Sequence, residues 1–70
     1  MKQVRSEMAG TILELKVKVG DAVKSGQEVA IVESMKMEVP LVSGTTGQVS
    51  KILKAVGDFI NDGDVVLELA

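Results

Sequence analysis

The sequence predicts an all-β fold, either a small sandwich or a barrel. Of the 70 residues, 12 are valine and 4 are isoleucine, and β-branched side chains favour strands over helices. Short apolar segments recur at a spacing of about 8–12 residues and are closed by Gly, Asp or Asn, as in sandwiches and barrels. No stretch has the periodicity of a convincing amphipathic helix. We expect one domain over residues 1–70, with its core in about residues 8–69, because a chain of this length supports one hydrophobic core.

The residue pattern predicts some strands more clearly than others. Residues 11–19 alternate between apolar and polar side chains, which predicts a strand with one face in water. The members that we expect on its buried face are Leu13, Leu15, Val17 and Val19. Residues 48–56 break strict alternation, so we expect a bulge or bend there. The short apolar runs 29–32 and 65–67 predict strands that enter the core.

The chain contains an internal repeat with an offset of 37 residues. At this offset the tripeptide Val-Gly-Asp at residues 19–21 coincides with the same tripeptide at 56–58, and two further pairs of glycines coincide, at residues 10 and 47 and at residues 26 and 63. Beyond Gly26 we expect the register to slip by one residue, because residues 29–31 also match residues 65–67. The repeat predicts two similar sheet-forming units packed face to face about a pseudo-two-fold axis.

Residues 33–38, Glu-Ser-Met-Lys-Met-Glu, lie between two β-prone runs and predict the tip of a hairpin. Tight two-residue turns favour Asn-Gly or Asp-Gly, because both central residues have positive φ, and neither pair occurs here. A sequence that breaks a local rule without a structural gain indicates function. Two structural alternatives remain at this point: Lys36 is an ordinary solvated charge, or Met35 and Met37 are core residues on one face.

Composition excludes most catalysis. The chain has no cysteine and no histidine, so it lacks a thiolate, a disulfide, the commonest general base and the commonest metal ligand. A net charge of −2 and a single aromatic residue, Phe59, argue against nucleic acid as a partner. No apolar run is long enough for a membrane span. The acidic residues Asp58, Asp62 and Asp64 lack the spacing of a calcium loop, so we interpret them as turn residues. We expect a cytoplasmic protein that is not an enzyme, without a catalytic or metal site.

The segment 33–38 resembles the attachment motif of biotinyl domains, the carrier modules of biotin-dependent carboxylases. The resemblance extends from about residue 8 to residue 69 and includes the flanking segments 19–26 and 57–63. It implies a flattened β-barrel, also described as a barrel-sandwich hybrid of two four-stranded antiparallel sheets. It also implies that a biotin protein ligase attaches biotin to Lys36, and that Met35 and Met37 are the neighbours that favour biotin. The flanks of the motif are Glu33, Ser34 and Glu38.

The resemblance further implies that the loaded arm carries a carboxyl group between a biotin carboxylase and a carboxyltransferase. A free lysine amine is almost wholly protonated near neutral pH, and nothing near Lys36 in the sequence would activate it, so the ligase must supply the base and an activated acyl donor. One alternative is a lipoyl carrier, which shares the fold but usually has an acidic residue before the lysine and alanine after it. A second alternative is an unmodified adaptor module, which would not need Met-Lys-Met at the tip.

Overall fold

The computed structural model describes residues 2–70 and consists of strands and turns, with no helix in that range. Correspondingly, the described part of the chain contains no helix that could span a membrane. The strands are β1 (Lys2–Arg5), β2 (Gly10–Leu15), β3 (Ala22–Val23), β4 (Glu28–Ser34), β5 (Met37–Val42), β6 (Gly47–Ile52), β7 (Phe59–Ile60) and β8 (Val65–Leu69). The molecule is elongated, with extents of 31, 19 and 18 Å.

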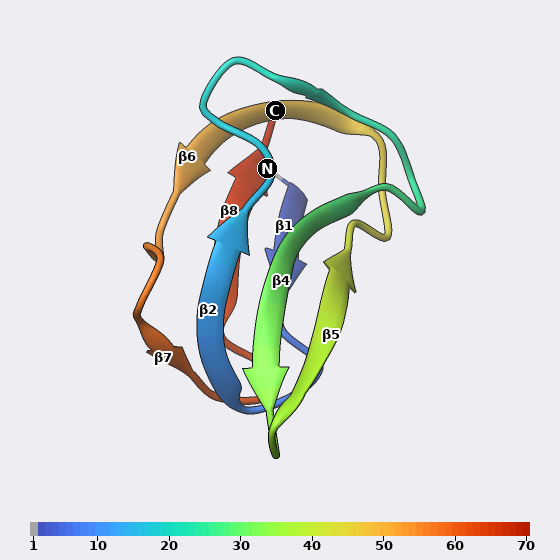
Figure 1. Cartoon of the computed structure of the whole chain (residues 1–70). Helices are drawn as coiled ribbons and strands as arrows, with labels where there is room; N and C mark the ends of the chain where they lie inside the picture. The colour runs from blue at the N-terminus through green and yellow to red at the C-terminus, as the bar shows by residue number, and fades with distance from the viewer. Residues whose placement is uncertain (1) are drawn as a thin grey trace.

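Two four-stranded antiparallel sheets form the molecule, with strand orders β1-β8-β6-β3 and β5-β4-β2-β7. We call the second the hairpin sheet, because β4 and β5 pair within it, and the first the opposite sheet. In Figure 1 the turn between β4 and β5 projects at one end of the molecule. The ends of the described chain meet at the other end, where Lys2 of β1 pairs with Leu69 of β8. The predicted sandwich of two four-stranded sheets is therefore confirmed.

The 37-residue repeat is a two-fold relation between the sheets. Adding 37 to the bounds of β2 and β3 gives the bounds of β6 and β7, and each sheet joins strands from both halves of the chain. Turn hydrogen bonds repeat as well: the amide of Gly20 donates to the carbonyl of Val49 at 2.8 Å, and the amide of Gly57 donates to that of Ile12 at 2.8 Å. These two glycines have φ of 98° and 93°, which explains why the Val-Gly-Asp turns need glycine.

The predicted slip in register after Gly26 is wrong. The pair Glu28–Val42 is repeated as the pair Arg5–Val65, which keeps the offset of 37 into the last strand. The local similarity of residues 29–31 to residues 65–67 misled the prediction, because valine, isoleucine and leucine are interchangeable in a pattern. Burial decides the register, since each of the equivalent residues Val29 and Val66 is fully buried.

The predicted strand 11–19 is only partly correct. β2 ends at Leu15, and its pairing with β4 shifts between Ile12 and Glu14. This bulge reverses the inside–outside pattern, so Ile12 is fully buried whereas Leu13, which we expected inside, faces out. Val19 was also expected inside but lies in the turn before Gly20 and is 62% exposed. The bulge expected in residues 48–56 is confirmed between Val49 and Lys51, at the position equivalent to the bulge in β2.

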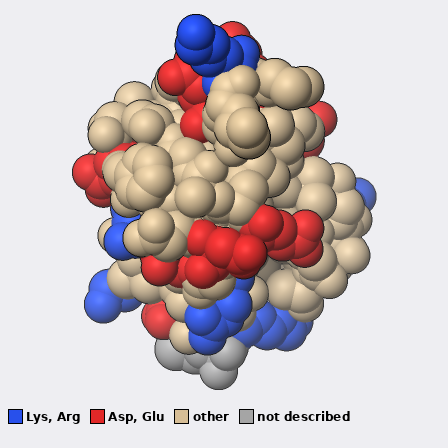
Figure 2. Space-filling view, turned by 90° about the horizontal axis from the view of Figure 1, so that it is seen from below, with Lys and Arg blue, Asp and Glu red and all other residues tan. Residues whose placement is uncertain are grey.

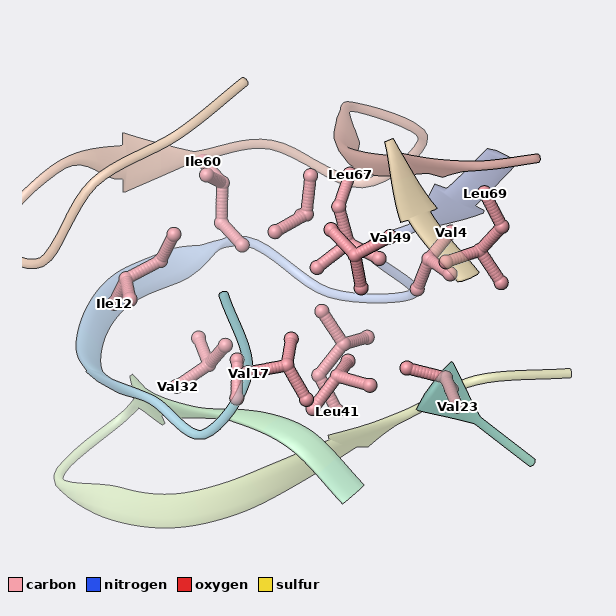
Figure 3. Close-up of a cluster of buried hydrophobic side chains, with 13 residues drawn as sticks. Val4, Ile12, Val17, Val23, Val32, Leu41, Val49, Ile60, Leu67 and Leu69 are labelled. Atoms are coloured by element: carbon pink, nitrogen blue, oxygen red, sulfur yellow. The ribbon is translucent and has the colours of Figure 1, made fainter. Parts of the chain in front are cut away.

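One apolar cluster fills the space between the sheets. Figure 3 shows side chains from both halves pointing toward one another, among them Ile12 and Ile60 and, further along, Val49 and Leu67. The short runs expected in the core do enter it, since Val29, Ala30 and Val32 are fully buried and so are Val66 and Leu67. The cluster also includes Val4, which precedes the expected start of the core at residue 8. The strands of the hairpin, β4 and β5, are part of this packed double sheet, which fixes where their turn lies.

Candidate functional site

The site is the turn that joins β4 to β5. These strands form six residue pairs, from Glu28–Val42 at one end to Ser34–Met37 at the tip, so only Met35 and Lys36 remain for the loop. Antiparallel pairing up to the last residue fixes the backbone of the turn relative to the core. The structure therefore brings the six residues of the predicted motif together at one projecting point, with Lys36 at its tip (Figure 1).

The backbone of the turn is strained. Met35 has φ of 52° and Lys36 has φ of 64°, and these are the positive values among the non-glycine residues of the described chain. Such geometry is that of a tight hairpin turn, in which both central residues are left-handed. Side chains other than Gly, Asn and Asp are disfavoured there by roughly 1–2 kcal/mol per residue. Strain of this kind indicates that the identity of the side chains matters more than the stability of the turn.

Both methionines of the motif are on the surface. Met35 is 93% exposed and Met37 is 66% exposed, so the alternative that they are core residues is wrong. Lys36 is exposed as well. Exposed thioethers contribute little to folding, but they are flexible and polarizable and therefore suit a recognition surface.

The immediate surroundings of the turn are acidic. Glu33 and Glu38 form a cross-strand pair next to the pair of Ser34 and Met37, and both carboxylates are exposed. Within residues 2–70 the single ion pair joins Lys16 to Glu28 at 3.2 Å, so neither of these carboxylates is tied to a cation of the described chain. Figure 2 looks at the end of the molecule to which the hairpin projects. It shows a basic group projecting at one margin with acidic groups beside it, a band of acidic groups across the middle, and further basic groups toward the opposite margin.

Lys36 is exposed and is not among the residues that line the groove described next. A groove in the structure is lined by Gln3, Arg5 and Val42 among others, and Val42 lies at the end of β5 remote from the turn. The carboxylates of Asp58 and Asp64 accept amide hydrogen bonds at 2.8 Å from Ala55 and Asn61, which agrees with their predicted role in turns. An exposed amine at the projecting tip of a hairpin is accessible for modification by another protein.

Fold and site together define a class of protein: a barrel-sandwich domain that presents one lysine on a rigid hairpin. The model of the family described as "Biotin-requiring enzyme" matches residues 2–69, so the chain belongs to the biotin/lipoyl attachment family. The chain is 52% identical over 67 residues to the biotin/lipoyl attachment protein of Bacillus subtilis, covering 96% of this chain and 92% of that protein.

Two further relatives are much longer proteins. The chain is 41% identical over 66 residues to the mitochondrial propionyl-CoA carboxylase alpha chain of Homo sapiens, covering 94% of this chain but 9% of that one. Among solved structures, the urea carboxylase of Kluyveromyces lactis superposes with a TM-score of 0.90 at 35% identity, over 99% of this chain and 6% of that one. The fold of this chain is therefore found both as a small protein and as a module of large carboxylases.

Proposed function

We propose that this chain is a biotin carrier domain in which Lys36 bears the covalently attached cofactor. The observation that supports this most strongly is the exposed Met35-Lys36 turn, whose left-handed backbone is occupied by the two residues of a carrier motif instead of by good turn formers. The relatives with carboxylase names support biotin as the cofactor. In this proposal the domain itself supplies the attachment point, and the catalytic groups belong to other enzymes.

The attachment reaction forms an amide between the lysine amine and the carboxyl carbon of biotin. The amine loses a proton to a base of the ligase, attacks the activated carbonyl and expels the activating group. The positive charge of Lys36 is lost, which changes the formal net charge of the chain from −2 to −3. We propose that a biotin protein ligase performs this step, because the carboxylates nearest the turn, Glu33 and Glu38, are much weaker bases than a lysine amine and do not deprotonate one efficiently.

When attached to Lys36, biotin would supply the group that carries a carboxyl between a biotin carboxylase and a carboxyltransferase. The protein's contribution is positional: the paired strands hold the attachment point, and the long flexible side chain moves. Tethering replaces diffusion of free biotin by a local search at an effective concentration of order mM. The chemistry of carboxyl transfer belongs to the cofactor and to the partner enzymes.

Intact mass spectrometry tests the proposal. Coexpression with a biotin protein ligase in the presence of biotin adds the mass of one biotinyl group to the wild-type chain, and tandem spectra place it on Lys36. The variant Lys36→Arg, which keeps the charge, gains no such mass while its thermal unfolding is unchanged. Biotin on the arginine variant would show that another residue is the acceptor.

Lipoate is a second candidate, because one relative is named as a biotin/lipoyl attachment protein. The same mass measurement separates the two cofactors when the chain is coexpressed with a lipoate ligase and lipoate. We expect methionine on both sides of Lys36 to favour biotin. The cytoplasmic location stays a prediction of the sequence.

A further inference from the structure

The two-fold relation between the sheets provides an internal comparison of their outer faces. Residues 37 positions apart occupy equivalent places in the same fold, so the fold makes the same demands on both. A consistent difference between the two faces therefore reflects something other than folding.

In the hairpin sheet, residues that pair across neighbouring strands form rows, and the first row that faces outward crosses the sheet from β7 to β5. Phe59 pairs with Thr11, which pairs with Glu33, which pairs with Glu38. Paired residues of antiparallel strands lie on the same face. Because Phe59 is 62% exposed and the next residue, Ile60, is fully buried, this row faces outward. At the place of the Phe59–Thr11 pair, the opposite sheet has the pair Ala22–Gln48.

The second outward row of the hairpin sheet consists of Glu14, Ile31 and Pro40. Its equivalent in the opposite sheet is the row Lys51, Glu68 and Gln3. In the bulges beside these rows, exposed Leu13 corresponds to Ser50. Four apolar residues on the outer face of the hairpin sheet thus have polar or small equivalents on the opposite sheet. The pairs are Leu13 and Ser50, Ile31 and Glu68, Pro40 and Gln3, and Phe59 and Ala22.

The charges of the two sheets differ in the same systematic way. The charged strand residues of the hairpin sheet are all acidic, namely Glu14, Glu28, Glu33 and Glu38. Those of the opposite sheet are Lys2, Arg5, Lys51 and Glu68, with a net charge of +2. Of the four glutamates in the hairpin sheet, Glu28 forms an ion pair with Lys16, and the other three form none with any residue of the described chain.

We propose that the outer face of the hairpin sheet, around Leu13, Ile31 and Phe59, is the surface on which the enzyme that acylates Lys36 docks. This rests on the proposed function. The complementary face of that enzyme carries an apolar recess for Phe59 and Leu13, with lysine or arginine side chains opposite Glu14, Glu33 and Glu38. Complementary charge of this kind raises the rate of encounter and fixes orientation.

The short distance between this face and Lys36 indicates that the protein docking on it is the enzyme that attaches biotin. The Glu33–Glu38 pair lies about 7 Å along the strands from Lys36, and Phe59 lies roughly 14 Å across the sheet from Glu38. A bare lysine arm is short, so an enzyme that receives it must cover this neighbourhood. Because biotin lengthens the arm, this demand is greatest for the enzyme that receives the unmodified lysine.

Because the two sheets have equivalent positions, a substitution on the hairpin sheet has a matched control at the equivalent position of the opposite sheet. The test variant Leu13→Ser/Phe59→Ala places on the hairpin sheet the residues that the opposite sheet already has at those positions. The control variant Ala22→Phe/Ser50→Leu makes the reverse exchange on the opposite sheet. A second test variant, Glu14→Lys, exchanges charge alone at an exposed position and keeps the proposal testable if the double variant folds poorly. Thermal unfolding establishes which of these variants are folded.

The experiment measures steady-state biotin transfer by a purified biotin protein ligase as a function of acceptor concentration. We expect kcat/KM to fall at least tenfold for Leu13→Ser/Phe59→Ala and severalfold for Glu14→Lys. The loss appears in KM while kcat stays within twofold, and the control variant matches the wild type. Unmodifiable Lys36→Arg protein competes with wild-type acceptor, and adding the Leu13→Ser/Phe59→Ala exchange to it weakens this competition.

The outcomes separate the two proposals. If wild-type protein is biotinylated on Lys36 and the folded test variants react with unchanged kcat/KM, docking on this face is wrong and the proposed function stands. If the control variant loses as much activity as the test variant, the face has no special role and the docking proposal is also overturned. If the wild-type chain gains no biotin, both proposals fail.

Discussion

Replacing the two turn residues by Asn-Gly should stabilise the domain while removing its function. In the structure both Met35 and Lys36 have positive φ, a conformation that costs an ordinary L-residue roughly 1–2 kcal/mol. Asparagine and glycine adopt it readily, and Asn-Gly is the preferred pair for such turns. Because Met35 is 93% exposed, its removal sacrifices little apolar burial.

The magnitude follows from two opposing contributions. Relief of strain at two residues contributes roughly 2–4 kcal/mol, and the greater freedom of glycine in the unfolded chain costs about 0.5–1 kcal/mol. Because asparagine does not relieve all of the strain at its position, we expect Met35→Asn/Lys36→Gly to raise the free energy of unfolding by about 1–2 kcal/mol. For a domain of this size each kcal/mol corresponds to about 4–8 °C in Tm.

Urea and thermal denaturation of the unmodified proteins measure this effect. Lys36→Arg is the matched control, because arginine keeps a long charged side chain and the left-handed strain, and its stability should equal that of the wild type. An Asn-Gly variant that is no more stable than the wild type would refute the reasoning that the turn is held in a costly conformation for the sake of its side chains.

Further predictions concern the methionines and two kinds of glycine. Met35→Asp/Met37→Ala should leave Tm nearly unchanged and lower the rate of biotin attachment in a ligase assay; an unchanged rate would remove the methionines from recognition. Gly10→Ala should destabilise the fold by about 1–3 kcal/mol in urea titrations, because a Cβ there would collide with the backbone carbonyl oxygen of Glu33. Gly44→Ala, in open space, is its control and should be neutral. Gly57→Ala should cost about 1 kcal/mol through its positive φ alone, with no steric neighbour; unchanged stability would contradict the turn geometry.

Much of the architecture could be predicted because it depends on short-range patterns. β-branched composition and turn residues predicted the strands, and the 37-residue offset predicted a pseudo-two-fold relation, which the structure shows between two sheets that each combine strands from both halves. The hairpin was predicted from two β-prone runs around residues 33–38, and the structure places Lys36 at its tip. The assignment of Lys36 as the attachment point stays a prediction until the modified protein is analysed.

The errors arose where a one-residue change in backbone geometry decides the outcome. The bulge after Ile12 turns Leu13 outward, and period-two alternation in the sequence contains no sign of it. The equivalent bulge near Val49 was anticipated only because its sequence pattern was irregular. Comparison of the two halves of the repeat could have signalled the first bulge from the second.

The sequence by itself determined the fold class, the repeat and the position of an unusual turn, because composition and periodicity are properties of neighbouring residues. The tertiary structure alone decided which strands pair, and pairing joins residues far apart in the chain. Phe59 and Glu33 share an outer row only because β7 and β4 both flank β2. The contrast between an apolar, acidic sheet and a polar, basic one therefore appears only after the chain has folded.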